Sequence, residues 1–395
     1  MFRKYEKGKG SEMGDELSEL FDSSADSVDY SAARMFELLR DPQVSQITVN
    51  RFDRIFYIDV SGTRTLEGVF PDSSSYRKWL NELLSITDAG YTDIDSARTS
   101  VIEASFNPDI TDLHGSIHVA TRELTRGDPA LTIRKQPHTL ITLDTMLSQG
   151  MMNQEMRRFL ELAVRGRANI LISGGSGAGK TTLARALSWY IEPSQRILTC
   201  EEIDELHIAD RLPNVVALTT YKSVDDEGKI LRRVELEDLV REGLRMRADR
   251  IWVGETRGKE AYALVKACNS GHDGSCTTVH ADNGKQAVKQ VVTYVMESGL
   301  TEEVAREQVA QAFHLVVQIA KVQMGRRVIT EITELEPVRE GSEQRRNVIF
   351  KYAPDSNSFV QVGQPTQRLL RDWARYGVNG LEALGVAKNS EAWRN

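Results

Sequence analysis

The residues with the clearest chemical pattern lie in the stretch ISGGSGAGKTTLARAL, which runs from Ile172 to Leu187. Positions 174–181 fill the spacing G-x-x-x-x-G-K-[ST]. Glycines let backbone N–H groups curl around phosphate oxygens, and the start of a following helix adds partial positive charge. We expect Lys180 to bridge the β- and γ-phosphates and the Thr181 hydroxyl to ligate Mg²⁺. The pattern predicts a nucleotide-binding loop formed by Gly174, Gly175, Ser176, Gly177, Ala178, Gly179, Lys180, Thr181 and Thr182.

A second candidate site follows the apolar stretch RIWVGET, in which Ile251 to Val253 predict a buried strand. This strand ends at Gly254 and Glu255. A carboxylate in that position can hold Mg²⁺, directly or through water, or orient an attacking water molecule. Glutamates often follow strands, so the signal gains weight only beside a nucleotide-binding loop. We therefore predict Glu255 as a metal-binding and catalytic residue.

Acidic residues crowd the end of another apolar run, ILTCEEIDELHI, where Glu201, Glu202, Asp204 and Glu205 stand together. Carboxylates this close repel one another unless a metal, an arginine or solvent relieves them. One interpretation is a solvated charged cluster. The other is a general base, or an acid that positions water.

Two histidines, His272 and His280, flank the short strand expected in CNSGHDGSCTTVHADN. No third metal ligand is nearby, which argues against zinc. Neutral histidines beside a phosphate site can form hydrogen bonds to it. A structural role in the core or on the surface is the alternative for each of them.

The elements that must position these residues follow from the hydrophobic pattern. From Asn169 onward, the short apolar runs NILIS, RILTC, VVALT, RIWVGE and SCTTVHA alternate with helical segments, which predicts an α/β sheet domain over 151–337. Mixed helical and alternating patterns predict a smaller α+β domain over 31–135, and 136–150 is expected to be a linker. Residues 1–30 are expected to form a disordered tail, or a short docking helix around ELSELF, and 338–395 a C-terminal extension that closes with a helix.

Composition limits the possible classes of protein. The chain of 395 residues has a formal net charge of −7 and a pI near 5.7, which argues weakly against nucleic acid as a direct ligand. Cys200, Cys268 and Cys276 lack metal-ligand spacing and suit a reducing compartment. The sequence has no run of about 18 apolar residues, so no transmembrane helix is expected. The charged N-terminus is not followed by the apolar segment of a signal peptide. A cytoplasmic location, with membrane association only through partners, is the resulting expectation.

The ordered set GGSGAGKTT, EEIDEL, LRMRADRIWVGETRGKEA and NSGHDGSCTTVHA resembles the ATPase superfamily of type II and type IV secretion systems, most of all its CpaF/TadA branch. The resemblance covers about residues 35–335, and GRRVITEITEL continues it past the last motif. Each motif alone is modest support, whereas the four in this order and spacing are highly specific.

The resemblance implies a RecA-like P-loop domain preceded by a smaller α+β, PAS-like domain, with ATP at their junction. It implies a homo-hexameric ring that hydrolyses ATP with Mg²⁺ to power secretion, pilus assembly or conjugative transfer, working with inner-membrane platform or channel proteins. By the same resemblance, Lys180 and Thr181 belong to the Walker A motif and Glu255 to the Walker B motif. Glu201 and Glu205 belong to the acidic motif, and His272 and His280 to the histidine motif. The resemblance also implies that Arg257 and Arg134 are accessory arginines of the site.

The sequence departs from the family pattern at a few positions. Ile117 stands where an arginine is frequent, whereas Ala248, Ser270 and Glu202 are mild changes. Two other classes of protein stay open. A RecA-type nucleic-acid motor predicts stimulation by DNA, and a nucleotide switch predicts ATP binding without turnover.

Overall fold

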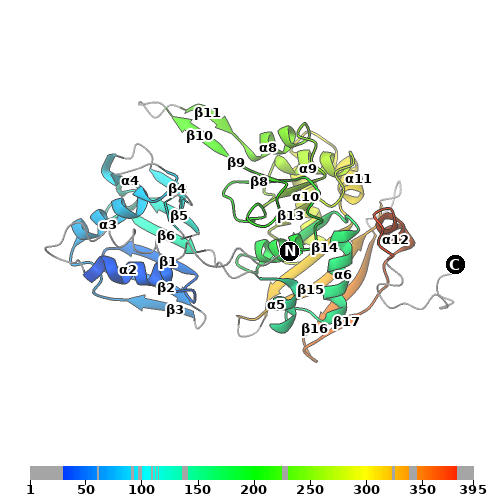
Figure 1. Ribbon diagram of the computed structural model, residues 1–395, viewed down its shortest axis with the longest axis horizontal. Coiled ribbons are helices and arrows are strands. Elements are labelled where there is room, and N and C mark those ends of the chain that lie inside the picture. The colour runs from blue at the N-terminus through cyan, green and yellow to red at the C-terminus, as the bar shows by residue number, and fades with distance from the viewer. Residues whose placement is uncertain are drawn as a thin grey trace, which may run out of the picture. The chain divides into compact units, whose positions relative to one another are not determined.

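The computed structural model describes residues 30–59, 62–89, 93–96, 100–107, 110–111, 113, 115–135, 141–224, 230–322, 325–337 and 345–379. The chain divides into two compact units, residues 1–139 and 140–395, each with its own core (Figure 1). The division falls inside the expected linker. The expected tail, apart from Tyr30, and everything after Asn379 lie outside the described residues.

The first unit is built around an antiparallel sheet of six strands in the order β3-β2-β1-β6-β5-β4. Apolar side chains of α2 and α3, among them Met35 and Trp79, pack with the inward-facing side chains of the strands. Strands β1 and β2 pair as an antiparallel hairpin. The elements are α2 (Tyr30–Arg40), β1 (Gln46–Arg51), β2 (Arg54–Asp59), β3 (Gly62–Leu66), α3 (Ser73–Ser85), the 3-10 helix η1 (Ile94–Ser96), β4 (Val101–Ser105), β5 (Gly115–Ala120), α4 (Arg122–Thr125) and β6 (Ala130–Lys135).

The second unit contains a sheet of nine strands in the order β17-β16-β15-β14-β7-β13-β12-β8-β9. Strands β14 to β9 in this order run parallel, whereas β15, β16 and β17 are antiparallel. The elements up to β12 are α5 (Leu143–Ser148), α6 (Gln154–Arg165), β7 (Ile170–Ser173), α7 (Lys180–Ser188), β8 (Ile197–Glu201), β9 (Val215–Thr219), β10 (Tyr221–Val224), β11 (Ile230–Val234), α8 (Leu236–Gly243) and β12 (Arg250–Val253). The later elements are α9 (Glu260–Cys268), β13 (Cys276–Val279), α10 (Gly284–Met296), α11 (Glu302–Ala312), β14 (Leu315–Lys321), β15 (Arg327–Leu335), β16 (Arg346–Ala353), β17 (Ser358–Gln361) and α12 (Gln367–Ala374).

Helices cover both faces of this sheet, so the parallel strands are apolar on both sides. In β7, Ile170 and Ile172 join the core shared with α6, α7 and α12, whereas Leu171 joins the core shared with α8 to α11. Together, the two units confirm the predicted fold class, an α/β RecA-like domain preceded by a smaller α+β domain.

Five elements of the second unit were not expected from the sequence: α5, β10, β11, β16 and β17. Helix α5 lies inside the expected linker, and β10 and β11 form a two-stranded ribbon that projects from the body of the unit (Figure 1). Strands β16 and β17 extend the sheet within the expected C-terminal extension, and Trp373 of α12 packs into the main core. The charged residues around β16 obscure its apolar centre, Ile349 and Phe350, which are both buried.

Buried polar groups tie together the amino ends of the parallel strands. Asn169, just before β7, accepts hydrogen bonds at Oδ1 from the N–H groups of Gly274 (2.8 Å) and Ser275 (3.0 Å). Its Nδ2 donates to the carbonyl of Ala312 (2.7 Å), and its backbone N–H donates to Nδ1 of His314 (2.9 Å). One side chain thus joins the segments that precede β7, β13 and β14.

Arg250 has a similar joining role at the start of β12. It is 1% exposed, and its guanidinium donates to Gln195 Oε1 (2.7 Å) and to the carbonyls of Gly274 (3.3 Å) and Val164 (2.9 Å). Burial lowers the pKa of Arg250 to about 9, because a charged group loses hydration in the interior. The carbonyl oxygens that it ties together replace much of that hydration.

None of the described helices is both long and apolar enough to cross a lipid bilayer.

Candidate functional site

The predicted nucleotide-binding loop lies between β7 and α7, at the carboxyl end of the central parallel strands. Gly177 and Gly179 have φ angles of 65° and 101°, a left-handed conformation that favours glycine. A Cβ atom on Gly174 would lie 2.3 Å from the carbonyl oxygen of Ile319, so only glycine fits there. Gly175, Ser176 and Gly177 are exposed. The backbone therefore has the shape and the accessibility that a phosphate cradle requires.

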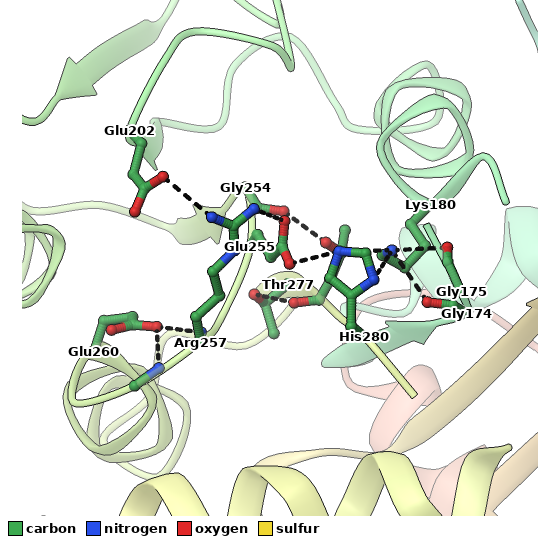
Figure 2. Close-up of polar contacts among 12 residues, drawn as sticks. Gly174, Gly175, Lys180, Glu202, Gly254, Glu255, Arg257, Glu260, Thr277 and His280 are labelled. Carbon is green, nitrogen blue, oxygen red and sulfur yellow. Dashed lines mark hydrogen bonds and ion pairs between the residues drawn. The ribbon is translucent and has the colours of Figure 1, made fainter. Parts of the chain in front are cut away.

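Lys180 begins α7 and is only 7% exposed. Its Nζ donates to the carbonyls of Gly174 (3.1 Å) and Gly175 (3.2 Å), and it lies 3.2 and 3.4 Å from the two ring nitrogens of His280 (Figure 2). The ammonium group is thus held against the inner side of the loop. Phosphate oxygens could take over these contacts, since a charge-assisted hydrogen bond is stronger than one to a neutral carbonyl.

His280 connects the loop to Glu255. It follows β13, and its Nε2 lies 2.9 Å from Glu255 Oε1, a contact that is an ion pair only when the imidazole is protonated. Glu255 follows β12, the neighbour of β13. A continuous line of polar contacts therefore runs from Lys180 through His280 to Glu255 (Figure 2). The structure brings together these three residues, all of which the sequence predicted.

Arg257 holds the other oxygen of Glu255. Its Nη2 donates to Glu255 Oε2 (2.8 Å), and its Nη1 lies 3.5 Å from Glu202 Oε2. The hydrogen bond to Glu255 is the main cause that raises the pKa of Arg257. Glu260 fixes the turn by accepting hydrogen bonds from the N–H groups of Arg257 and Gly258 (Figure 2). Arg257 thereby orients the carboxylate without occupying the side that faces His280.

Threonines at the carboxyl end of β13 connect this strand to the turn after β12 that carries Glu255. Thr278 Oγ1 donates to the carbonyl of Gly254 (2.9 Å), and the hydroxyls of Thr256 and Thr277 lie 2.7 Å apart. The N–H of Thr256 donates to the carbonyl of Thr278 (2.8 Å). These contacts lock the turn that carries Glu255, and no motif in the sequence marked the threonines for this role.

Glu201 is turned away from solvent. It is 3% exposed, and its Oε2 accepts hydrogen bonds from the N–H groups of Glu205 and Leu206, both at 3.0 Å. Burial, and next the charge of Asp204, raise the pKa of Glu201 well above its usual value. Glu201 thus shapes the acidic loop from inside, whereas Glu205 is partly exposed.

Several buried polar atoms around this end of the sheet have no hydrogen-bond partner among the described residues. Such atoms are uncommon in folded proteins, and a bound ligand or water is one frequent reason for them. They belong to strands or strand ends next to the loop and the acidic residues, and they are Ser173 Oγ, Thr199 Oγ1, Glu201 Oε1, Glu255 Oε1 and Gln318 Oε1.

Two predicted site residues stand outside this group of contacts. His272 precedes β13, at the opposite end of the strand from His280, and its Nδ1 contacts the carbonyl of Ala267 (3.2 Å). Arg134 is exposed on β6 of the first unit. Ile117, where the family often has arginine, is 1% exposed in the core of that unit. The site roles of His272 and Arg134 stay predictions.

Sequence reasoning also missed basic residues that approach the site from other elements. Arg185 of α7 faces the acidic loop: burial lowers its pKa, and the charges of Asp210, Asp204, Glu201 and Glu205 oppose that effect. Arg327 of β15 donates from Nε to the carbonyl of Gly177 (3.1 Å). Arg185 lies in the helix after the loop and Arg327 in GRRVITEITEL, but neither stretch assigned a site role to these residues.

Comparison with known proteins identifies the family. Residues 103–351 match the type II/IV secretion system protein family, and the chain belongs to that family. It is 34% identical over 219 residues to the conjugal transfer protein TrbB of Rhizobium radiobacter, covering 55% of this chain and 63% of that protein, which is less than two thirds of its length. It is 29% identical over 323 residues to the type IV secretion system protein VirB11 of Bartonella quintana, covering 74% of this chain and 89% of that protein.

Among solved structures, the VirB11 ATPase of the Brucella suis type IV secretion system is 25% identical, with a TM-score of 0.39, covering 78% of this chain and 94% of the other. The family match confirms the predicted superfamily, that of the type II and type IV secretion systems. The CpaF/TadA branch stays a prediction. The activity, substrates and partners of the whole protein are proposals.

Proposed function

We propose that the protein is a Mg²⁺-dependent ATPase that works as a homo-hexameric ring and powers a type II/IV-like secretion, pilus-assembly or conjugative transfer machine. One observation carries the proposal: the contacts that connect Lys180 in the phosphate loop, through His280, to Glu255. This arrangement puts a cation for the phosphates and a carboxylate for the attacking water at opposite ends of one short path.

Phosphate binding is the task of the loop and Lys180. The N–H groups of the exposed residues 175–177 and the start of α7 would supply positive potential for the phosphates. Lys180 would exchange its contacts with Gly174 and Gly175 for oxygens of the β- and γ-phosphates. Because its ammonium is nearly buried already, little further desolvation is needed when ATP binds.

The residues that would hold Mg²⁺ are Thr181, which is half-buried at the start of α7, and Glu255. A hydroxyl and a carboxylate fit a hard cation that prefers oxygen ligands, and Glu255 Oε1 lacks a hydrogen bond. In the described part of the chain, no group of three or more His, Cys, Asp or Glu residues could hold a metal by itself. Phosphate oxygens and water would therefore complete the coordination, and the ion would neutralise the charge that develops on the phosphates.

Activation of water falls to Glu255. Its side chain is 24% exposed as a whole, whereas Oε1 is buried, so the attacking water would have to enter between Oε1 and the loop. Arg257 holds one carboxylate oxygen in place, which leaves the other facing His280 and the loop. Glu201 is unsuited to this task because it is buried and bound to backbone N–H groups, so we assign it to positioning the acidic loop. Glu205, the other glutamate that the resemblance assigns to the acidic motif, is partly exposed.

Further parts of the proposal rest on the family resemblance. Arg134 of the smaller domain would reach the nucleotide when the domains close and would neutralise charge on the γ-phosphate. The cargo, the direction of force and the partner proteins stay open within this proposal. A position at the inner face of the cytoplasmic membrane, reached through membrane partners, and the absence of direct nucleic-acid binding complete it.

The first test is the Mg²⁺-ATPase rate per subunit as a function of protein concentration, with Lys180→Ala as the blank. A specific rate that climbs with concentration, together with a ring by size measurement, supports a site completed by assembly. A strictly monomeric protein at all concentrations, with and without ATP, overturns the ring. Turnover that rises on addition of DNA would favour a nucleic-acid motor, and tight ATP binding without turnover would favour a nucleotide switch.

A further inference from the structure

Two basic residues lie beside the phosphate loop on a hairpin that no motif marks. β14 pairs in parallel with β7 as far as Gln318 opposite Ser173, where β7 ends, and then continues to Lys321. β15 returns alongside β14, so that Arg327 stands opposite Lys321 in the antiparallel ladder. The hairpin therefore runs next to the loop that follows β7, on the side opposite to β13 and His280.

Both side chains reach the loop itself. Arg327 Nε donates to the carbonyl of Gly177 at 3.1 Å. A Cβ atom on Gly177 would lie 3.0 Å from Lys321 Nζ, and one on Gly179 would lie 3.3 Å from Arg327 Cδ. The two cations thus lie in contact with the turn whose N–H groups form the phosphate cradle, and both residues are exposed to solvent.

Their charges have no counterpart in the described part of the protein. Like charges placed directly opposite each other in a sheet are destabilising, and no ion pair with a carboxylate joins Lys321 or Arg327 among the described residues. Arg327 uses one N–H group on the loop, which leaves its two Nη groups available. An anion held at the loop would offset this repulsion and occupy those donors.

We propose that Lys321 and Arg327 bind the phosphate groups of the nucleotide in the loop of their own subunit. The inference rests on the proposed function, because it assumes that the loop holds a nucleotide. Lys180 then approaches the polyphosphate from the side of β13, and the hairpin approaches it from the side of β14. A polyphosphate bound between cations on both sides is recognised mainly by its charge, independently of the base.

The variants Lys321→Gln, Arg327→Gln and the double variant test this in the full chain. Glutamine keeps most of the side-chain length and removes the charge. Arg326→Gln is the matched control: Arg326 is the neighbouring cation, but its Nη2 donates to Tyr352 OH (2.9 Å) and to Asn357 Oδ1, away from the loop. Calorimetric titration with ATP, and displacement of bound nucleotide by inorganic tripolyphosphate, provide the readouts, with thermal unfolding as the check on folding.

We expect each single variant to weaken binding of ATP and of tripolyphosphate about 10-fold and the double variant about 100-fold, because each loses a charge-assisted contact. The control should stay within about 2-fold of wild type. Equal affinities in the double variant and the control overturn the inference while leaving the proposed function intact. Weaker ATP binding with unchanged tripolyphosphate binding also overturns it, because the contacts would then be to the base or sugar. A wild-type protein that binds neither ligand overturns both.

Discussion

The two ends of the parallel strands in the second unit differ in how their polar groups are used. At the amino ends, the side chains of Asn169 and Arg250 form hydrogen bonds with the segments that precede the strands. At the carboxyl ends, buried oxygens of Ser173, Glu255 and Gln318 have no hydrogen bond in the described structure. Buried polar side chains thus form a closed network at one end of the strands and an incomplete one at the other.

This difference between the two ends suggests that the amino ends of the strands contribute mainly to stability and the carboxyl ends mainly to ligand binding. A completed buried network stabilises the fold and leaves nothing for a ligand. An incomplete one costs free energy in the absence of a ligand and recovers it when phosphate, metal or water supplies the missing partners. Changes at the carboxyl end should therefore reduce turnover while sparing stability, and changes at the amino end should do the reverse.

The largest effect is expected for Lys180→Ala. Removing the ammonium that contacts both the loop and His280 should lower kcat/KM for ATP by at least about 10³-fold and weaken ATP binding. The free energy of unfolding should change little in the absence of nucleotide. Steady-state ATPase assays and urea unfolding measure the two quantities; retained turnover would remove the loop from the mechanism.

Next comes Glu255→Gln, which should lower kcat by about 10²–10³-fold with nearly unchanged ATP affinity, because the amide cannot accept a proton from water. Single-turnover assays and nucleotide titration separate the two effects. Wild-type turnover in this variant would refute the assignment of Glu255.

The comparison is sharpened by Asn169→Ala at the other end of the strands. It leaves the N–H groups of Gly274 and Ser275 and the carbonyl of Ala312 buried without their partner, which should cost about 3 kcal/mol of stability. Turnover per folded molecule should match wild type. Asn214→Ala, at a half-buried position, is the control and should cost below about 1 kcal/mol. Equal losses in both variants would contradict the closed network.

The smallest effect concerns Glu201→Gln and pH. Burial raises the pKa of Glu201 in the fold, so its contribution to stability is fully present below its ordinary pKa and is lost as pH rises through the raised value. Glutamine does not titrate. The variant should therefore gain stability relative to wild type as pH increases across that window, measured by urea unfolding from about pH 5 to 8. If the difference in free energy of unfolding between the variant and wild type stayed constant across this pH range, Glu201 would not be desolvated in the fold.

A site residue could be predicted from the sequence when the strand directly before it determines its position. It could not be predicted when its position depends on the pairing of strands that are distant in the sequence. The loop, Glu255 and His280 could be placed because each directly follows an apolar strand, and parallel strands bring their carboxyl ends to one edge. Lys321 and Arg327 could not, because only the pairing of β14 with β7 takes them to the loop. The burial of Glu201, the threonines of β13 and the strand β16 likewise depend on packing that local patterns do not contain.

The position of Trp373 has a consequence for synthesis of the chain. Its indole fills the space over Gly166, where even a methyl group would lie 2.5 Å from the ring, and it closes the core beside α6. The loop at 174–181 leaves the ribosome well before β14, Arg327 and this tryptophan, which at translation rates of about 5–20 residues per second corresponds to roughly 10–40 s before Trp373. Until β14 has also emerged, the nascent domain has its central strand β7 but lacks one of the two strands that flank it, so that edge of the sheet stays unpaired during synthesis.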